Sequence, residues 1–314
     1  MDRTVNPVLA VDVGGTKLAA ALVDRTGAVL RRDQTPTPVG ADAETTWQAL
    51  ADLCDRVTAG TAPGGVGVGC VGPMTWPAGE VSPLNVGGWR GFPLRARLAD
   101  RFAGVPVRVH NDGVATAVGE HWRGAGRGRA NMLGMVVSTG VGGGLVLGDR
   151  LVDGGTGNAG HVGHVVVDPD GPPCACGGRG CLEAVAAGPA VTRWALAHGW
   201  RPSGGVGPTA REVAAAARSG DPVARAAFDR AGELAGQGIA STVTLLDLDT
   251  VIVGGGLAQA GPLLFEPLLR GFRRHARMAF ARRALVLPAA LGADAGLVGA
   301  AALVWRADRY WAGD

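Results

Sequence analysis

The chain has 314 residues, of which 47% are apolar and 18% charged, a composition typical of a globular α/β protein and not of a disordered one. A net charge of +3 is too small to favour a nucleic-acid partner, and no apolar segment approaches the length of a membrane span. The first 15 residues lack the features of a signal peptide. We therefore expect a soluble, cytoplasmic protein with room for two domains.

The first half of the chain reads as a set of short strands with a few helices. A helix is predicted over 43–59, because Trp47, Leu50, Leu53 and Val57 fall on one helical face. A second helix is expected over 114–122. The expected strands of this half are 8–13, 18–23, 28–31, 66–71 and 105–109.

The second half is expected to begin with a second set of strands and to be mainly helical after it. Thr209 and Glu212 form a capping box, and Asp221-Pro222 should open a long helix to about residue 247. Further helices are predicted over 262–276 and after Asp294, which would cap the last one. The expected strands are 132–138, 145–147, 162–167, 250–253 and 285–287.

A glycine turn follows the first strand in the hexapeptide Asp12-Val-Gly-Gly-Thr-Lys17. Adjacent glycines free backbone N–H groups to face phosphate oxygens, and the carboxylate of Asp12 could hold Mg²⁺ through water. An ordinary hairpin turn fits the hexapeptide equally well. Lys17 is the only lysine in the chain, which is either chance or a compact charge placed beside the turn.

Two further glycine clusters follow predicted strands, at 138–144 and at 254–256. Consecutive glycines permit close approach of the backbone to phosphate. A glycine-rich hairpin and an ordinary strand-to-helix connection are the simpler interpretations of these clusters. Two glycine turns, each closing a set of strands, suggest two related α/β lobes with a cleft between them.

Asn111-Asp112 comes directly after a short buried strand. Phosphoryl transfer to a hydroxyl needs a carboxylate that accepts the proton, and the carboxyl end of a strand is a suitable place for it. Asp112 could equally cap the helix that follows.

One imidazole and three thiols crowd together at His164, Cys174, Cys176 and Cys181, with Glu183 close behind. Such a set can close a tetrahedral Cys3His shell around Zn²⁺; a cluster of free thiols is the alternative. The other two cysteines, Cys54 and Cys70, are expected to be buried apolar residues.

The motifs occur in the order DVGGTK, GCVGP, LNVGGW, HND, STGVGGG, GHVGH, CACGGRGCLE and VIVGGGL. In this combination the chain resembles the ROK family of sugar kinases and sugar-responsive repressors. The resemblance implies two actin-like (ribonuclease H-like) α/β lobes, with a structural zinc site. The N-terminal lobe would span 1–115 and be joined by a C-terminal helix, 297–314; the other lobe would span 116–296.

The resemblance also implies the chemistry, which is ATP-dependent, Mg²⁺-requiring phosphorylation of the 6-hydroxyl of a hexose, with glucose as the default. Asp112 would be the general base. The sugar would be bound by Asn111, Asp112, His161, His164 and Glu183, and zinc by His164, Cys174, Cys176 and Cys181. The ATP site would comprise Asp12, Gly14, Gly15, Thr16, Lys17, Thr139, Gly140, Gly142, Gly255 and Gly256.

One position departs from the family pattern. Most ROK sugar kinases read G-E-x-G-H, whereas here the second residue is His161. A carboxylate only accepts hydrogen bonds, but a neutral imidazole both donates and accepts. Either glucose binding tolerates the change, or the preference moves to an amino or N-acylated hexose such as kanosamine, N-acetylglucosamine or N-acetylmannosamine.

Other classes of function follow from the same resemblance. The repressors of the family carry an N-terminal DNA-binding domain, for which the sequence before Asp12 leaves no room, so we expect no nucleic-acid partner. A sugar sensor without catalysis is a further alternative. Members are commonly dimers or tetramers, so a homo-oligomer is expected.

Overall fold

The computed structural model describes residues 6–202 and 207–313. The expected domain bounds also include residues 1–5, 203–206 and 314, which lie outside the described residues. The chain divides into two compact units, of which unit 1 comprises 1–130, 144–160 and 291–314, and unit 2 comprises 131–143 and 161–290. None of the helices in the described part of the chain is both long and apolar enough to cross a lipid bilayer.

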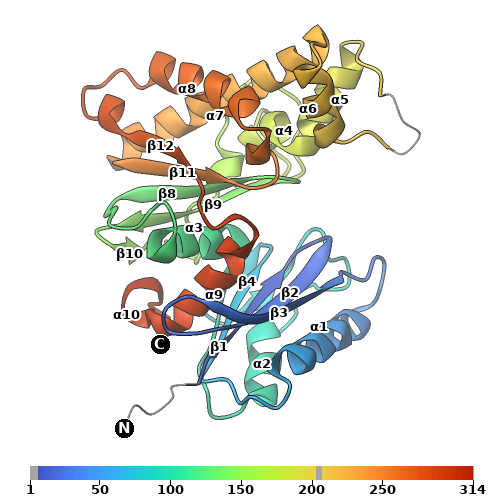
Figure 1. Ribbon diagram of the computed structural model, residues 1–314, viewed down its shortest axis with the longest axis vertical. Helices are drawn as coiled ribbons and strands as arrows, with labels where there is room; N and C mark the ends of the chain where they lie inside the picture. Colours follow the sequence, from blue (N-terminus) through green and yellow to red (C-terminus); the bar gives the residue numbers. More distant parts are fainter. Residues whose placement is uncertain (1–5, 203–206, 314) are drawn as a thin grey trace. The chain divides into compact units, whose positions relative to one another are not determined.

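Unit 1 is built on a sheet with the strand order β3-β2-β1-β4-β7 (Figure 1). β1 and β2 pair as an antiparallel hairpin, whereas β1, β4 and β7 run parallel. The strands are β1 Val8–Val13, β2 Lys17–Val23, β3 Val29–Pro36, β4 Val66–Cys70 and β7 Val107–Asn111, with a small hairpin of β5 Met74–Thr75 and β6 Glu80–Val81. The helices of this unit are α1 Ala43–Thr58, α2 Leu94–Arg101, α3 Asp112–Arg123, α9 Ala295–Trp305 and α10 Ala307–Tyr310, with a short 3-10 turn η4 Gly292–Asp294.

Because successive side chains of a strand point to opposite faces, the two faces of this sheet pack against different hydrophobic cores. Leu9, Val11 and Val13 pack with α1 and α2 on one face, and Val8 and Ala10 pack with α9 on the other. The predicted helical face of α1 is confirmed, since Trp47, Leu50, Leu53 and Val57 are all buried. α9 lies so close to β4 that a Cβ on Gly67 would stand 1.8 Å from the carbonyl oxygen of Ala300, so only glycine fits there.

Unit 2 contains most of a second sheet, whose strand order is β10-β9-β8-β11-β12. Its strands are β8 Met132–Val137, β9 Val141–Leu147, β10 Arg150–Leu151, β11 Thr250–Gly254 and β12 Leu285–Pro288, and the limit between the units falls inside β9. The helices are α4 Leu182–Ala186, α5 Gly188–Ala197, α6 Ala210–Arg218, α7 Pro222–Leu246 and α8 Pro262–His275, with 3-10 turns η1 Val162–His164, η2 Ala258–Ala260 and η3 Ala281–Arg283.

Two predicted helix starts are confirmed and a third is corrected. The capping box of Thr209 and Glu212 is present, and the side chain of Asp221 accepts the N–H of Ala224 at the start of α7. Asp294 occupies the cap position of α9, but its side chain makes no capping bond. It pairs with Arg32 at 2.7 Å instead, because the preceding residues already turn as η4.

The strand predicted over 162–167 is wrong. Val162–His164 forms η1, and only Val166 makes a sheet-like bridge, to Cys181. A Cβ on Gly163 would lie 2.0 Å from the carbonyl oxygen of Val141, so this segment packs tightly against β9 and bends. The run of valines resembles a strand in sequence, but the bend turns His164 toward the thiols.

Candidate active site and zinc site

The glycine turn of unit 1 is the connection between β1 and β2. The N–H of Gly14 donates to the carbonyl of Lys17 at 3.0 Å, and the carbonyl of Gly14 accepts the hydroxyl of Thr37 at 2.7 Å. Thr16 is braced too, because its carbonyl accepts the N–H of Thr37. A Cβ on Gly15 would stand 2.5 Å from Cβ of Asn85. The turn is therefore a hairpin connection with a fixed shape, in which Gly15 has to be glycine.

Asp12 is the last polar residue of β1 and lies beneath this turn. Burial, followed by the charge of Asp112, raises the pKa of Asp12 from 3.8 to about 6, and the charge of Lys17 opposes the rise. Gly69 on the neighbouring strand lies close to both residues, since a Cβ there would be 3.4 Å from Cα of Asp112 and 3.9 Å from Oδ1 of Asp12. Asp12 and Asp112 are thus two like charges near each other, which a cation could neutralise.

Asn111 and Asp112 stand where β7 ends and α3 begins. Asn111 is the last residue of the strand and is buried, and Asp112 is the first residue of the helix, with Oδ1 accepting the N–H of Gly113 at 2.7 Å. The amide nitrogen of Asn111 donates to the carbonyl of Gly157 at 3.5 Å and to Oδ1 of Asn158 at 3.4 Å. Among the described residues, Oδ1 of Asn111 is buried and has no hydrogen-bond partner, so it is an acceptor whose bonding capacity is unused.

The two glycine clusters of unit 2 lie against each other. The turn after β8 is held by a bond from the N–H of Ser138 to the carbonyl of Gly140 at 2.8 Å, and it contains Thr139; Gly142 follows in β9. Gly255 has a φ of +94°, and a Cβ there would be 2.4 Å from the carbonyl oxygen of Val137. A Cβ on Gly256 would lie 3.3 Å from Oγ of Ser138. The close approach that the glycines permit is thus partly to the backbone of a neighbouring strand.

Glu183 connects the zinc loop to the glycine turn of the same unit. It lies in the first turn of α4, two residues after Cys181. Its Oε2 accepts the N–H of Val141 at 2.8 Å, and a Cβ on Gly140 would lie 2.6 Å from the same oxygen. The turn and the carboxylate therefore share one site in unit 2.

The four predicted metal ligands come together. The candidate ligand atoms of His164, Cys174, Cys176 and Cys181 all lie within 4.8 Å of one another. Nδ1 of His164 is 3.8 Å from Sγ of Cys174, and Sγ of Cys176 is 3.7 Å from Sγ of Cys181. Ligands at about 2.3 Å from a tetrahedral Zn²⁺ are about 3.8 Å apart, so donor types and spacing both fit zinc. Burial raises the pKa of Cys181 to about 12, and zinc would have to displace that proton.

The remaining predicted residue, His161, precedes η1 and is exposed. Its ring lies beside that of His164, with ring centroids 6.0 Å apart and planes inclined by 25°. Cys54 and Cys70 are free and buried, as predicted.

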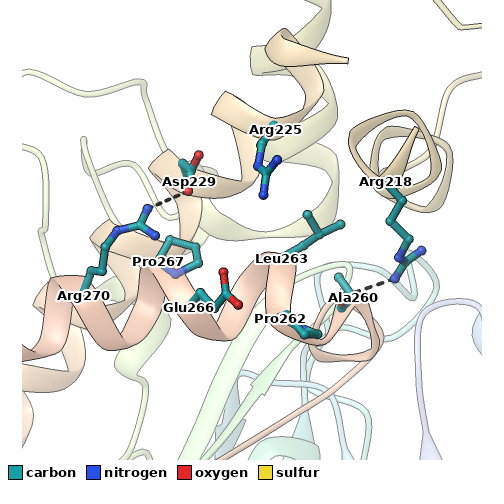
Figure 2. A pocket seen from close by; sticks show the side chains of 9 residues that line it. All are labelled: Arg218, Arg225, Asp229, Ala260, Pro262, Leu263, Glu266, Pro267 and Arg270. Carbon is teal, nitrogen blue, oxygen red and sulfur yellow. Dashed lines mark hydrogen bonds and ion pairs between the residues drawn. The ribbon is translucent and has the colours of Figure 1, made fainter. Parts of the chain in front are cut away.

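Figure 2 shows a pocket of about 390 Å³ elsewhere in unit 2, lined by residues of α6, η2, α7 and α8. Two of its three arginines have partners, because Arg218 donates to the carbonyl of Ala260 at 3.2 Å and Arg270 pairs with Asp229 at 2.6 Å. Glu266 adds a second carboxylate to the lining. None of the predicted site residues lines this pocket, in which three arginines face two carboxylates.

Sequence reasoning did not find several residues that hold the site. They are Thr37, Asn85, His110, Asp153 and Asn158. Asn85 lies in the motif LNVGGW and His110 precedes Asn111, so both stand next to recognisable signals. The others bond across the fold from segments without a local signal.

The chain is similar to known proteins along nearly its whole length. The model of the ROK family matches residues 8–307. Glucokinase from Streptomyces coelicolor is 35% identical over 96% of this chain and 98% of its own. N-acetylmannosamine kinase from Citrobacter koseri is 36% identical over 94% and 97%, respectively. The structure of a ROK family glucokinase from Streptomyces griseus in complex with glucose and AMPPNP is 36% identical, covers 96% of this chain and 99% of that one, and has a TM-score of 0.83. On the family match along nearly its whole length, this chain belongs to the ROK family.

Proposed function

We propose that this chain transfers the γ-phosphoryl group of ATP to the 6-hydroxyl of a hexose, with glucose as the preferred sugar. The observation that carries the proposal is the pair of neighbouring carboxylates, Asp12 near the carboxyl end of β1 and Asp112 directly after β7, in which the charge of Asp112 helps to raise the pKa of Asp12. Phosphoryl transfer needs one acidic group near the metal and phosphates and another near the attacking hydroxyl. The glucokinases among the relatives support glucose as the acceptor.

In this proposal Asp112 accepts the proton of the 6-hydroxyl as the hydroxyl oxygen attacks phosphorus. Asn111 orients the sugar, since its buried Oδ1 can accept a hydrogen bond from a hydroxyl group. Asp12 holds Mg²⁺ through water, which fits a buried carboxylate whose pKa is raised by burial and by a like charge. The bound Mg²⁺ would supply positive charge to the β- and γ-phosphates. Gly14, Gly15, Thr16 and Lys17 face those phosphates from the turn.

Unit 2 carries the other residues to which the proposal assigns a role. Glu183 and His164 bind sugar hydroxyls, and the turn with Thr139, Gly140 and Gly142 faces phosphate. Nδ1 of His164 points to the thiols, so Nε2 is left for the sugar. Gly255 and Gly256 face the nucleoside. Zn²⁺ in the Cys3His shell would fix the loop that carries His164 and Glu183. A homo-oligomer and a cytoplasmic location are part of the proposal and rest on the family.

The test is a panel of hexoses with ATP, with total zinc measured on the same sample. We expect glucose to be the best acceptor, and about one zinc per chain because the four ligands make one shell. Asp112→Asn should lower kcat, while Asp100→Asn, an exposed aspartate of α2 in the same unit, should leave it unchanged. Glucose binding without turnover in the wild type would point instead to a sugar sensor. Undiminished turnover in Asp112→Asn would remove Asp112 as the base.

An N-acylhexosamine kinase is the second candidate, favoured by His161 and by the N-acetylmannosamine kinases among the relatives. The exposed ring of His161 lies beside the His164 ring, where a donor and an acceptor could both meet an N-acyl group. If this candidate is right, the wild type prefers an amino or N-acylated hexose, and His161→Glu moves the preference toward glucose. His198→Glu, at an exposed histidine of the same unit, is the control. A glucose optimum in the wild type removes this candidate.

A further inference from the structure

We propose that His110 and Asp153 form a positioning pair that fixes Asn111 and Asp112 for the transfer step; the inference rests on the proposed kinase function. Neither residue touches the reacting atoms in this proposal. Their part is to hold the end of β7 and the loop that follows β10 in one arrangement, so that the sugar-binding amide and the base keep their places.

Both polar atoms of the His110 ring are bonded, and both bonds lead to the site. The side chain is 0% exposed. Nδ1 accepts the backbone N–H of Asn111 at 2.9 Å, and Nε2 lies 3.0 Å from Oδ1 of Asp153. Because a backbone N–H can only donate, Nδ1 must carry no proton, and the proton must be on Nε2 facing the carboxylate. The bonds therefore select one neutral tautomer.

The loop that contains Asp153 is the same loop that holds the side chain of Asn111. The carbonyl of Asp153 accepts the N–H of Ala159 at 3.1 Å, which closes the loop on itself. Between these two residues lie Gly157 and Asn158, which accept the amide of Asn111. Two consecutive residues of β7 are thus tied to one loop, His110 at its start and Asn111 at its end.

Packing alone does not account for an imidazole and a carboxylate at this position. A buried charge is costly unless it is hydrogen-bonded, and the side chain of Asp153 is only 11% exposed. An apolar residue at 110 would fill the space without that cost. It would, however, leave the buried N–H of Asn111 without its acceptor and the loop without its anchor. Asp112 follows Asn111 directly, so a shift of this peptide would move the base as well.

The same unit offers a matched control. His121 is also buried, at 2% side-chain exposure, and also faces an aspartate, with Nε2 3.4 Å from Oδ1 of Asp149. Its other bonds go to the hydroxyl of Tyr310 at 2.6 Å and the carbonyl of Arg129 at 3.0 Å. None of these partners belongs to the proposed site. If kcat falls only because unit 1 has become less stable, His110→Ala and His121→Ala should therefore lower kcat by similar factors.

The experiment compares kcat, KM and melting temperature in the wild type and four variants. Asp153→Ala and His110→Ala should each lower kcat by about 10- to 100-fold, the size expected for a catalytic group displaced by up to about 1 Å. The KM for ATP should stay within about twofold, because Gly14–Lys17 is braced by other bonds, and the KM for glucose should rise. Asp153→Asn keeps the acceptor oxygen and should retain most of kcat. His121→Ala should lower the melting temperature with kcat near that of the wild type.

The double variant His110→Ala with Asp153→Ala should lose no more than the worse single variant, because both act through one pair. The proposal would be overturned if the kcat losses of the two single variants multiplied in the double variant. It would also be overturned if Asp153→Ala left kcat unchanged, or if His121→Ala lowered kcat as much as His110→Ala. Should His110→Ala fail to fold, Asp153→Ala carries the test.

A readout independent of activity separates this proposal from the kinase proposal. Nitrogen-15 NMR of the His110 ring should show the neutral tautomer with the proton on Nε2, and that proton should exchange faster in Asp153→Ala. A wild type that phosphorylates none of the sugars defeats the kinase function. A His110 ring with its proton on Nδ1 defeats the positioning pair, whatever the activity.

Discussion

Replacing Asp12 by asparagine should stabilise unit 1 and, at the same time, remove the kinase activity. In the folded protein the pKa of Asp12 is about 6, against 3.8 for an ordinary aspartate, chiefly because of burial and then because of Asp112. One pKa unit corresponds to about 1.4 kcal/mol. Ionised Asp12 therefore costs the folded protein about 3 kcal/mol above pH 6. Asparagine has nearly the same shape and no charge, so it avoids this cost.

The sign of the pH dependence follows from the raised pKa. Between about pH 4 and 6 the folded protein holds a proton on Asp12 that the unfolded chain has released, so stability falls as the pH rises through this range. The cost is absent below pH 3.8 and complete above pH 6. The gain from Asp12→Asn should accordingly be largest at pH 7.5 and should shrink toward zero near pH 4.

Urea unfolding followed by tryptophan fluorescence measures the effect, because six of the eight tryptophans belong to unit 1. Asp24→Asn is the control in the same unit. Asp24 is half-buried. Burial acts to raise its pKa, but the hydrogen bonds from Thr26 and Ala28 outweigh burial and lower the pKa, so its stabilising contribution is present at pH 7.5 and is lost as the pH falls through its folded pKa. That variant should be destabilised where Asp12→Asn is stabilised. A wild type as stable as Asp12→Asn at pH 7.5 would refute the reasoning from charge burial.

Three further outcomes are expected. Asp112→Asn should lower kcat by about 10²- to 10⁴-fold, as for loss of a general base, with glucose binding retained in calorimetry. Cys176→Ser should reduce the zinc content below one per chain and lower the melting temperature of unit 2, since a structural zinc contributes to folding; full zinc occupancy would argue against the Cys3His shell. Gly163→Ala should destabilise unit 2 by about 2–4 kcal/mol, as for overpacking against a rigid backbone, because its Cβ would lie 2.0 Å from the carbonyl oxygen of Val141; an unchanged urea midpoint would contradict this close approach.

Local chemistry made much of the fold predictable. The cap at Asp221 and the capping box at Thr209 depend on residues three positions apart, and the apolar face of α1 depends on helical spacing. The zinc ligands could be predicted because the ligands from Cys174 to Cys181 are close in the chain and unusual in type. Caps, helical spacing and closely spaced metal ligands can be recognised without knowledge of the tertiary structure.

Long-range contacts could not be read from the sequence in the same way. His110 and Asp153 are 43 residues apart, and Glu183 and Val141 are 42 apart, so only the fold brings them together. The valines at 162–167 led to an incorrect strand prediction, because a strand and a tightly packed ligand loop both favour β-branched residues. The decisive feature, the fit of Gly163 under Val141, is a tertiary contact.

The placement of α9 has a consequence for how the protein is made. The strands and helices of unit 1 up to Asn111 are synthesised before unit 2, but Leu297 and Ala300, which cover one face of that sheet, are synthesised after it. At about 5–20 residues per second, roughly 10 to 40 seconds separate the two events. During that time a nascent sheet exposes an apolar face, while most of unit 2 emerges as one nearly continuous stretch. Protection of this apolar face until α9 has been synthesised should therefore raise the yield of folded protein.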